Sequence, residues 1–212
     1  MFRVRIHGRG GQGVVTAAEL LSEAAFRQGR YAQAFPFFGS ERTGAPVVSF
    51  CRIADEPIRA HDPVTTPDAV IVQDVTLLGH VDVLAGLRPD GFVLLDSPRR
   101  PADLGLHGAP PPDRTVVVPV PATAIARHHL GRPLPNTPLL GAFAAVTGLV
   151  SLDAVVAALL ERFPGVVGQR NAEAARAAYW LVLGPDTAEA APPAEREGAT
   201  LETAEVPRAA AG

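Results

Sequence analysis

The chain has 212 residues, of which 47% are hydrophobic, and a formal net charge of −3. This length fits one domain or a small domain pair with a sizeable core. The slightly acidic balance gives no indication of nucleic acid or an anionic membrane as a partner, and no segment approaches the ~18 apolar residues of a membrane span.

The first 26 residues predict a strand, a glycine-rich turn and a helix. Apolar and polar residues alternate over 2–7, as in a strand with one buried face, and apolar residues recur every three or four positions over 14–26. The turn between them is Gly8-Arg9-Gly10-Gly11-Gln12-Gly13. A glycine turn that opens a helix presents free N–H groups and the positive end of the helix dipole, which suits a phosphate.

The glycine spacing also matches the dinucleotide-binding fingerprint. That fingerprint requires an acidic residue about twenty positions further on, and the segment 31–35 around Gln33 has none. We therefore do not expect NAD binding. Two interpretations of the turn stay open: it contacts a phosphate or other anion, or it only lets the helix and strand pack closely.

The remaining pattern predicts an α/β protein with a Rossmann-like, mostly parallel sheet flanked by helices and a helical C-terminal part. The expected strands are 31–38, 47–53, 69–74, 92–97 and 115–120. The expected helices are 77–87, 121–131, 139–147 with Asn136 as N-cap, 152–163 capped by Ser151, and about 169–183. Residues 139–147 are apolar nearly all round, so that helix should be buried.

Polar residues follow three of the predicted strands: the glycine turn, Gln73-Asp74 and Asp96-Ser97. In a parallel sheet, these would share the edge where ligands bind. A polar loop over 39–46 contains Ser40, Glu41, Arg42 and Thr43. It is equally compatible with a solvated hairpin loop and with a loop that faces a substrate or partner.

We assign residues 1–183 to one domain and 184–212 to a tail rich in Ala, Pro and Glu. The tail has few large apolar groups to offset its ordering entropy, so we expect it to be disordered. The chain opens with a strand pattern rather than an apolar signal region, and we expect a cytoplasmic protein.

The sequence contains no catalytic or metal-binding motif that we can identify. Its six histidines lack metal-ligand spacing, a P-loop is impossible without lysine, and there is no G-x-S-x-G motif. The single cysteine, Cys51, excludes an internal disulfide and an iron–sulfur cluster held by this chain alone, which needs about four cysteines. Cys51 lies in an apolar run and is expected to be a buried thiol. These features indicate one component of a larger assembly.

Three stretches resemble one family: 5–13 with the G-x-G-G-Q-G turn, 31–47 with F-P-F-F-G-S-E-R-T-G-A-P, and 130–143 with Asn136-Thr137. Together they are similar to the gamma subunit of 2-oxoacid:ferredoxin oxidoreductases, in the pyruvate and 2-ketoisovalerate branch. The resemblance covers about residues 2–183. The glycine turn is shared with other branches of the family, whereas the second stretch favours the pyruvate-like branch.

The resemblance implies an enzyme that converts a 2-oxoacid and coenzyme A to an acyl-CoA and carbon dioxide and reduces ferredoxin. It implies partner alpha, beta and delta subunits that hold thiamine diphosphate and the iron–sulfur clusters. For the gamma subunit, it implies a role in coenzyme A binding and assembly. The positions that we expect at such a site are Gly8, Arg9, Gly10, Gly11, Gln12, Gly13, Ser40, Glu41, Arg42, Thr43, Asn136 and Thr137.

Two alternatives remain at this stage. The chain could be the smaller subunit of an indolepyruvate-type enzyme, although the 35–44 segment argues against this. It could also be a nucleotide-binding module with a Rossmann-like fold that acts outside any oxidoreductase.

Overall fold

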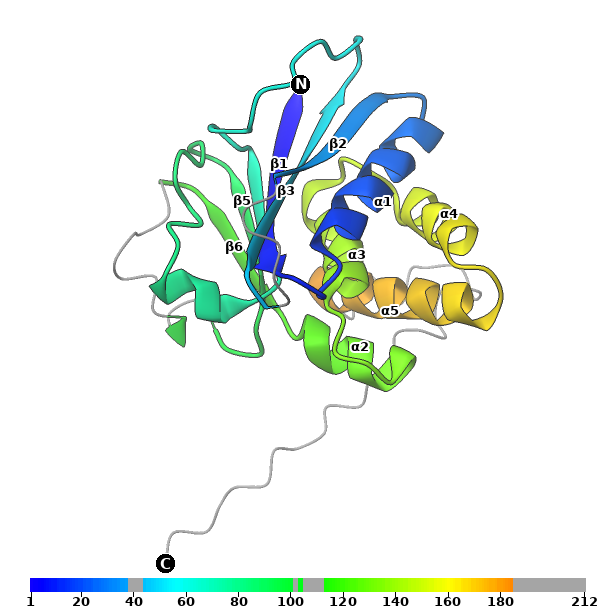
Figure 1. The fold of residues 1–212 in the computed structure, drawn as a ribbon. Helices are drawn as coiled ribbons and strands as arrows, with labels where there is room; N and C mark the ends of the chain where they lie inside the picture. Colours follow the sequence, from blue (N-terminus) through cyan, green and yellow to red (C-terminus); the bar gives the residue numbers. More distant parts are fainter. Residues whose placement is uncertain (38–43, 101–102, 105–112, 185–212) are drawn as a thin grey trace, which may run out of the picture.

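The computed structural model describes residues 1–37, 44–100, 103–104 and 113–184. Within them, six strands form one sheet in the order β2-β3-β1-β4-β5-β6 (Figure 1). Their bounds are β1 Phe2–Arg9, β2 Tyr31–Phe37, β3 Pro46–Ala54, β4 Ala69–Val72, β5 Phe92–Asp96 and β6 Val116–Val120. Neighbours from β1 through β4 and β5 to β6 are parallel, and β3 runs antiparallel to both β1 and β2. The expected mostly parallel α/β sheet is confirmed, and the tail from 185 onward lies outside the described residues.

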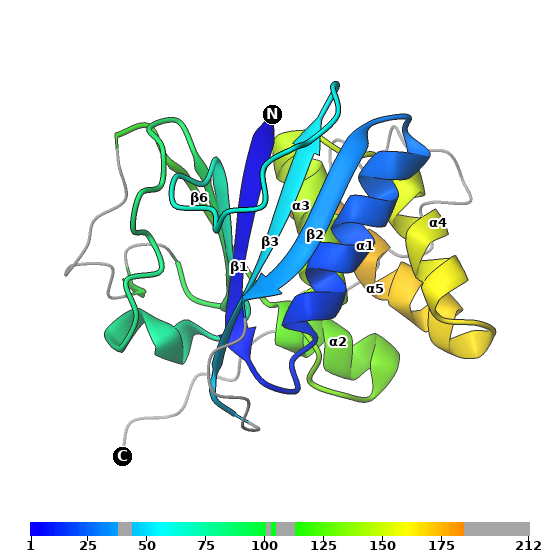
Figure 2. The ribbon, with the colours of Figure 1, turned by 45° about the horizontal axis from the view of Figure 1, so that its top comes forward.

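Helices cover one face of this sheet. Figures 1 and 2 show α1, α3, α4 and α5 stacked on the same side. The bounds are α1 Val14–Arg27, α2 Ala122–Leu130, α3 Asn136–Thr147, α4 Leu152–Arg162 and α5 Val166–Leu183. The predicted cap of α4 is confirmed, because Ser151 Oγ accepts a hydrogen bond of 3.2 Å from the Ala154 N–H.

Two predictions about helices are wrong. The stretch 77–87 is not an α-helix; the chain forms a short 3-10 helix, η1 (Val75–Gly79), followed by turns. Helical geometry already ends at Gly79, and Gly86, with a φ of 69°, lies outside the helical region. Asn136 is not an N-cap, because Pro135 with φ −73° and ψ −9° already has helical geometry, so Asn136 is the first residue of α3 and has no capping bond.

The core lies between the sheet and the helices. Residues alternate along each strand, so Val4 and Ile6 of β1 and Ile71 of β4 point toward the helices and are almost fully buried. Helix α3 is buried at every position from Asn136 to Ala144, as its apolar sequence predicts. It lies inside the helical layer, packed against α5.

Helices α3 and α5 approach each other at the backbone. A Cβ on Gly141 of α3 would lie 2.0 Å from the carbonyl oxygen of Ala175 in α5. Ala175 is one of five buried alanines of α5, with Ala172, Ala174, Ala177 and Ala178. Small residues on both helices therefore set a short interhelical distance.

The other face of the sheet has no α-helix among the described residues and is covered by η1 and connecting segments. Buried arginine side chains from β1 and β3 hold these segments. Arg5 Nη2 donates to the carbonyl oxygens of Val83 at 3.0 Å and Ala85 at 2.6 Å. Its Nε donates to Nε2 of His7 at 3.0 Å. Burial, aided by the Arg5 charge, lowers the pKa of His7 to about 3.

Gly141→Ala tests the close contact between α3 and α5. Overpacking against a backbone carbonyl costs about 3 kcal/mol, and the better helix propensity of alanine offsets about 1 kcal/mol. We expect a net loss of about 2 kcal/mol in the free energy of unfolding, measured by urea denaturation. Gly79→Ala is the matched control, since a Cβ there meets no atom within 4 Å. Equal stability of the two variants would contradict the close approach.

His7 predicts a pH dependence of stability. The folded chain keeps His7 neutral down to about pH 3, whereas the unfolded chain protonates it near its ordinary value of about 6.5. The unfolded state therefore binds more protons in this window, and stability falls as pH falls below about 6.5. Between pH 6.5 and 5 the His7 contribution is about 2 kcal/mol.

The measurement is the urea midpoint against pH for the unaltered chain and for His7→Gln. Glutamine retains an acceptor for Arg5 Nε but does not titrate. We expect a flatter curve for the variant, and superimposable slopes would show that His7 does not carry the effect.

Candidate functional site

The glycine turn joins β1 to α1 at the carboxyl end of β1. Two of its glycines are required by neighbouring side chains: a Cβ on Gly8 would lie 2.6 Å from Cγ2 of Val14, and a Cβ on Gly13 would lie 2.5 Å from Nδ2 of Asn136. Gly13 also has a φ of 74° as the N-cap residue of α1. Close packing is therefore part of the role of this turn, and the contact with an anion stays a prediction.

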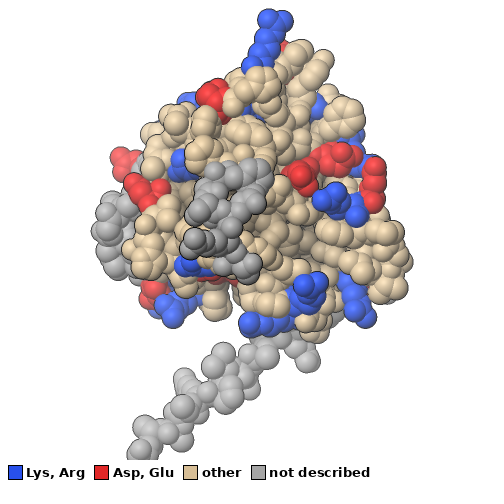
Figure 3. All heavy atoms as spheres, viewed as in Figure 1, with Lys and Arg blue, Asp and Glu red and all other residues tan. Residues whose placement is uncertain are grey.

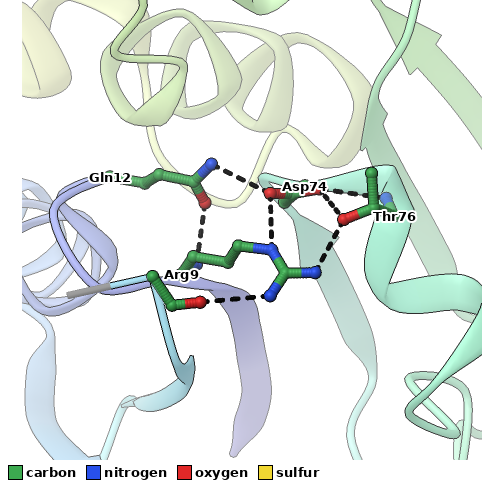
Figure 4. A network of polar contacts seen from close by, with 5 residues as sticks. Arg9, Gln12, Asp74 and Thr76 are labelled. Atoms are coloured by element: carbon green, nitrogen blue, oxygen red, sulfur yellow. Dashed lines mark hydrogen bonds and ion pairs between the residues drawn. The ribbon is translucent and has the colours of Figure 1, made fainter. Parts of the chain in front are cut away.

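A polar network fixes the turn to the end of β4 (Figure 4). Gln12 folds back, so that its Oε1 accepts from the Arg9 N–H at 2.7 Å, and its Nε2 donates to Oδ2 of Asp74 at 3.2 Å. Arg9 Nε donates to the same Oδ2 at 3.0 Å. Burial acts to raise the pKa of Asp74, but hydrogen bonds from Thr76 and Gln12 and the Arg9 charge hold this pKa below its ordinary value.

Arg9 also connects the turn to the segment that enters β3. Its Nη1 donates to the Gly44 carbonyl at 3.1 Å, and its Nη2 donates to Oγ1 of Thr76 at 2.8 Å. Two main-chain hydrogen bonds join the same segments: the Gly10 N–H donates to the Ala45 carbonyl, and the Gly44 N–H donates to the Gly10 carbonyl. The turn, the start of β3 and the start of η1 thus form one connected unit.

The N-terminus of α1 has no side-chain cap. The first N–H groups of an α-helix have no partner within the helix, and the helix dipole places partial positive charge there. The start of α1 can therefore accept an anionic group through its main chain.

The predicted common edge is confirmed, because β1, β4 and β5 are parallel and end together. Asp96, at the end of β5, accepts hydrogen bonds from the N–H and Oγ1 of Thr123 and so holds the start of α2. Burial raises the pKa of Asp96, and the nearby charge of Asp74 acts in the same direction. Gln73 is 1% exposed, and its amide atoms have no hydrogen-bond partner among the described residues.

The structure brings only some of the predicted site residues together. Gly8 to Gly13 lie at this edge with Asn136, which is buried beside Gly13. Thr137 instead points toward α5, where its Oγ1 donates to Oδ1 of Asn171 at 2.8 Å. Ser40, Glu41, Arg42 and Thr43 lie outside the described residues.

Asp74 and Thr76 were missed as members of the glycine-turn network. Because Asp74 follows a buried strand, the sequence correctly predicts that it lies at the carboxyl edge of the sheet. Nothing in the sequence pairs it with Arg9, which is 65 residues away.

The described residues contain no group of three or more His, Cys, Asp or Glu side chains that could hold a metal ion. Cys51 is fully buried, and burial raises the pKa of its thiol, as expected for a structural cysteine. Among the helices of the described ranges, none is long and apolar enough to cross a membrane.

Surface charges of opposite sign lie side by side. Figure 3 shows acidic and basic side chains together at the right, over α1 and α4. There Arg162 pairs with Glu19 at 3.3 Å and Arg27 pairs with Glu23 at 3.1 Å. Charge over α1 and α4 is therefore largely compensated.

Comparison with known proteins gives consistent matches over the described domain. The family model of pyruvate ferredoxin/flavodoxin oxidoreductase matches residues 3–181. The pyruvate synthase subunit PorC of Methanothermobacter marburgensis is 52% identical over 179 residues, which span 84% of this chain and 96% of that protein. The common gamma subunit of the pyruvate/ketoisovalerate oxidoreductases of Pyrococcus furiosus is 48% identical over the same shares of the two chains.

A solved structure agrees with these matches. The crystal structure of pyruvate oxidoreductase subunit PORC from Thermotoga maritima superposes with a TM-score of 0.74 at 39% identity, covering 84% of this chain and 94% of that one. The chain therefore belongs to the pyruvate ferredoxin/flavodoxin oxidoreductase family, among the gamma-type subunits represented by PorC.

Proposed function

We propose that the chain is the gamma subunit of an assembly that converts a 2-oxoacid, pyruvate in the first place, and coenzyme A to an acyl-CoA and carbon dioxide while reducing ferredoxin. In this proposal, alpha, beta and delta subunits complete the assembly. We also propose that it works in the cytoplasm, as expected from the sequence. The observation that carries the proposal is the 52% identity to a pyruvate synthase subunit over nearly the whole of that protein.

The cysteine content of this chain supports the proposal that the iron–sulfur clusters are held by partner subunits. An iron–sulfur cluster requires about four thiolate ligands, and the sequence has one cysteine, which is buried. We propose that thiamine diphosphate and the clusters are bound by the other subunits, and that this chain contributes binding surface rather than reacting groups.

We propose that the edge around the glycine turn contributes to coenzyme A binding. The uncapped start of α1 supports this role, since its main-chain N–H groups and dipole favour a phosphate. The proposed contact region comprises Gly8, Arg9, Gly10, Gly11, Gln12, Gly13, Ser40, Glu41, Arg42, Thr43, Asn136 and Thr137. Within it, Asn136 is set beside Gly13, and Thr137 contributes indirectly by holding α3 to α5.

Gentle affinity purification of this chain from its native cell tests the assembly. We expect a brown eluate that contains thiamine- and cluster-binding subunits and reduces ferredoxin with pyruvate and coenzyme A. A colourless chain that elutes alone would refute the subunit assignment and favour an independent ligand-binding module. Activity with aryl pyruvates but not with pyruvate would instead favour the indolepyruvate-type enzyme.

Gly11→Asp in the complete complex tests the coenzyme A contact. Gly11 is exposed in the turn, so a carboxylate there would repel a phosphate at the start of α1. We expect the KM for coenzyme A to rise about tenfold, equivalent to about 1.4 kcal/mol, with the KM for pyruvate unchanged.

Gly11→Ala is the matched control, because it introduces the same backbone strain at φ 93° without the charge. If Gly11→Asp changes neither the KM for coenzyme A nor assembly, the proposed contact is wrong. If it only abolishes assembly, the glycines serve packing against another subunit.

A further inference from the structure

One carboxylate organises the glycine turn. Asp74 accepts four hydrogen bonds: Oδ2 accepts from Arg9 Nε and Gln12 Nε2, and Oδ1 accepts from the Thr76 N–H at 3.0 Å and from Thr76 Oγ1 at 2.6 Å. Its side chain is 16% exposed. Both of its oxygens are thus committed to protein donors from two separate segments.

Arg9 is equally committed. Its Nε, Nη1 and Nη2 donate to Asp74, to the Gly44 carbonyl and to Thr76. Its charge is compensated by Asp74, 3.0 Å away. An arginine held in this way joins three segments through its planar fork, and three of its five N–H donors are already bound to protein acceptors.

We propose that Asp74 is a positioning residue for coenzyme A binding: it holds Arg9 and Gln12 and so fixes the glycine turn in the orientation that presents the main-chain N–H groups of α1. The inference rests on the proposed function of this edge. It assigns anion recognition to the main chain and, within the contact region proposed above, gives Arg9 an indirect role: Arg9 holds the turn in place.

Fixing the orientation matters because main-chain N–H groups act only along their own directions. Gly11 and Gly13 have positive φ, a region in which glycine moves freely. Without side-chain restraints, a turn with these residues samples many orientations, and binding a ligand to one of them costs conformational free energy. The bonds of Asp74 remove that freedom before the ligand arrives.

The test uses the complete complex and measures kcat and the KM for coenzyme A. Asp74→Asn removes the charge that holds Arg9, and we expect the KM for coenzyme A to rise about tenfold with kcat and the KM for pyruvate unchanged. Arg9→Lys should behave alike, because lysine keeps the charge but cannot span three partners. Thr76→Val, which removes only the hydroxyl bonds, should raise the KM about threefold.

Asp68→Asn is the matched control. Asp68 precedes β4, at the opposite end of that strand from Asp74. It is 19% exposed, pairs with Arg3 and Arg88, and accepts the Arg3 N–H at 2.8 Å. Its loss should lower stability about as much as the loss of Asp74, while the KM for coenzyme A stays unchanged. An effect on KM that follows stability alone would overturn the inference.

The remaining outcomes separate the inference from the proposed function. If Asp74→Asn lowers the KM for coenzyme A and makes it more sensitive to salt, the released Arg9 binds the phosphate and the positioning role is wrong. An increase in KM with Gly11→Asp but not with Asp74→Asn or Thr76→Val refutes the inference and leaves the proposed contact intact. No change in KM with any of these variants refutes both. Thr76→Val provides the answer if Asp74→Asn does not assemble, since it keeps the Asp74 charge and the Arg9–Asp74 pair.

Discussion

Hydrogen bonds from buried arginines to backbone carbonyls attach the connecting segments to the face of the sheet that has no α-helix among the described residues. On that face, connecting segments lie on the sheet, and backbone carbonyls that they turn toward it need hydrogen-bond donors. Arg5 supplies them to Val83 and Ala85, and Arg52, which is 2% exposed, supplies them to Ala60 at 3.2 Å and to Asp62. A guanidinium suits this task because one side chain offers five donors in a plane. The covering layer is therefore attached by polar bonds as well as by the apolar contacts of η1.

The same use of arginine recurs at the carboxyl edge of the sheet. Arg9 binds a carbonyl, a hydroxyl and a carboxylate, as Arg5 binds three carbonyls and an imidazole. The difference is charge: Arg9 has Asp74 as a counter-ion, and Asp96 adds a second carboxylate nearby. An anion that approaches this edge therefore meets a compensated surface, so the start of α1 is left as the source of positive potential.

Sequence reasoning succeeded where one element determines its own geometry. The strands follow from runs of apolar residues, the Ser151 cap from local hydrogen bonding, and the common edge from parallel strand direction. It failed where distant segments decide. Leucines over 77–87 fit a helical pattern, but the chain there forms turns after η1. These leucines pack in a second apolar cluster, on the face of the sheet opposite the α-helices. The Arg9–Asp74 pair depends on the register of β1 with β4, which the sequence does not reveal.

Helix α3 links the glycine turn to the rest of the helical layer. Its first residue, Asn136, fills the space beside Gly13, and Gly141, further along, touches the backbone of α5. Thr137 adds a buried hydrogen bond to Asn171 of the same helix. Because close-packed elements shift together rather than deform, the position of α5 sets the position of α3, which in turn limits the space beside Gly13. Residues of α5 without any contact to the carboxyl edge thus belong to its mechanical support.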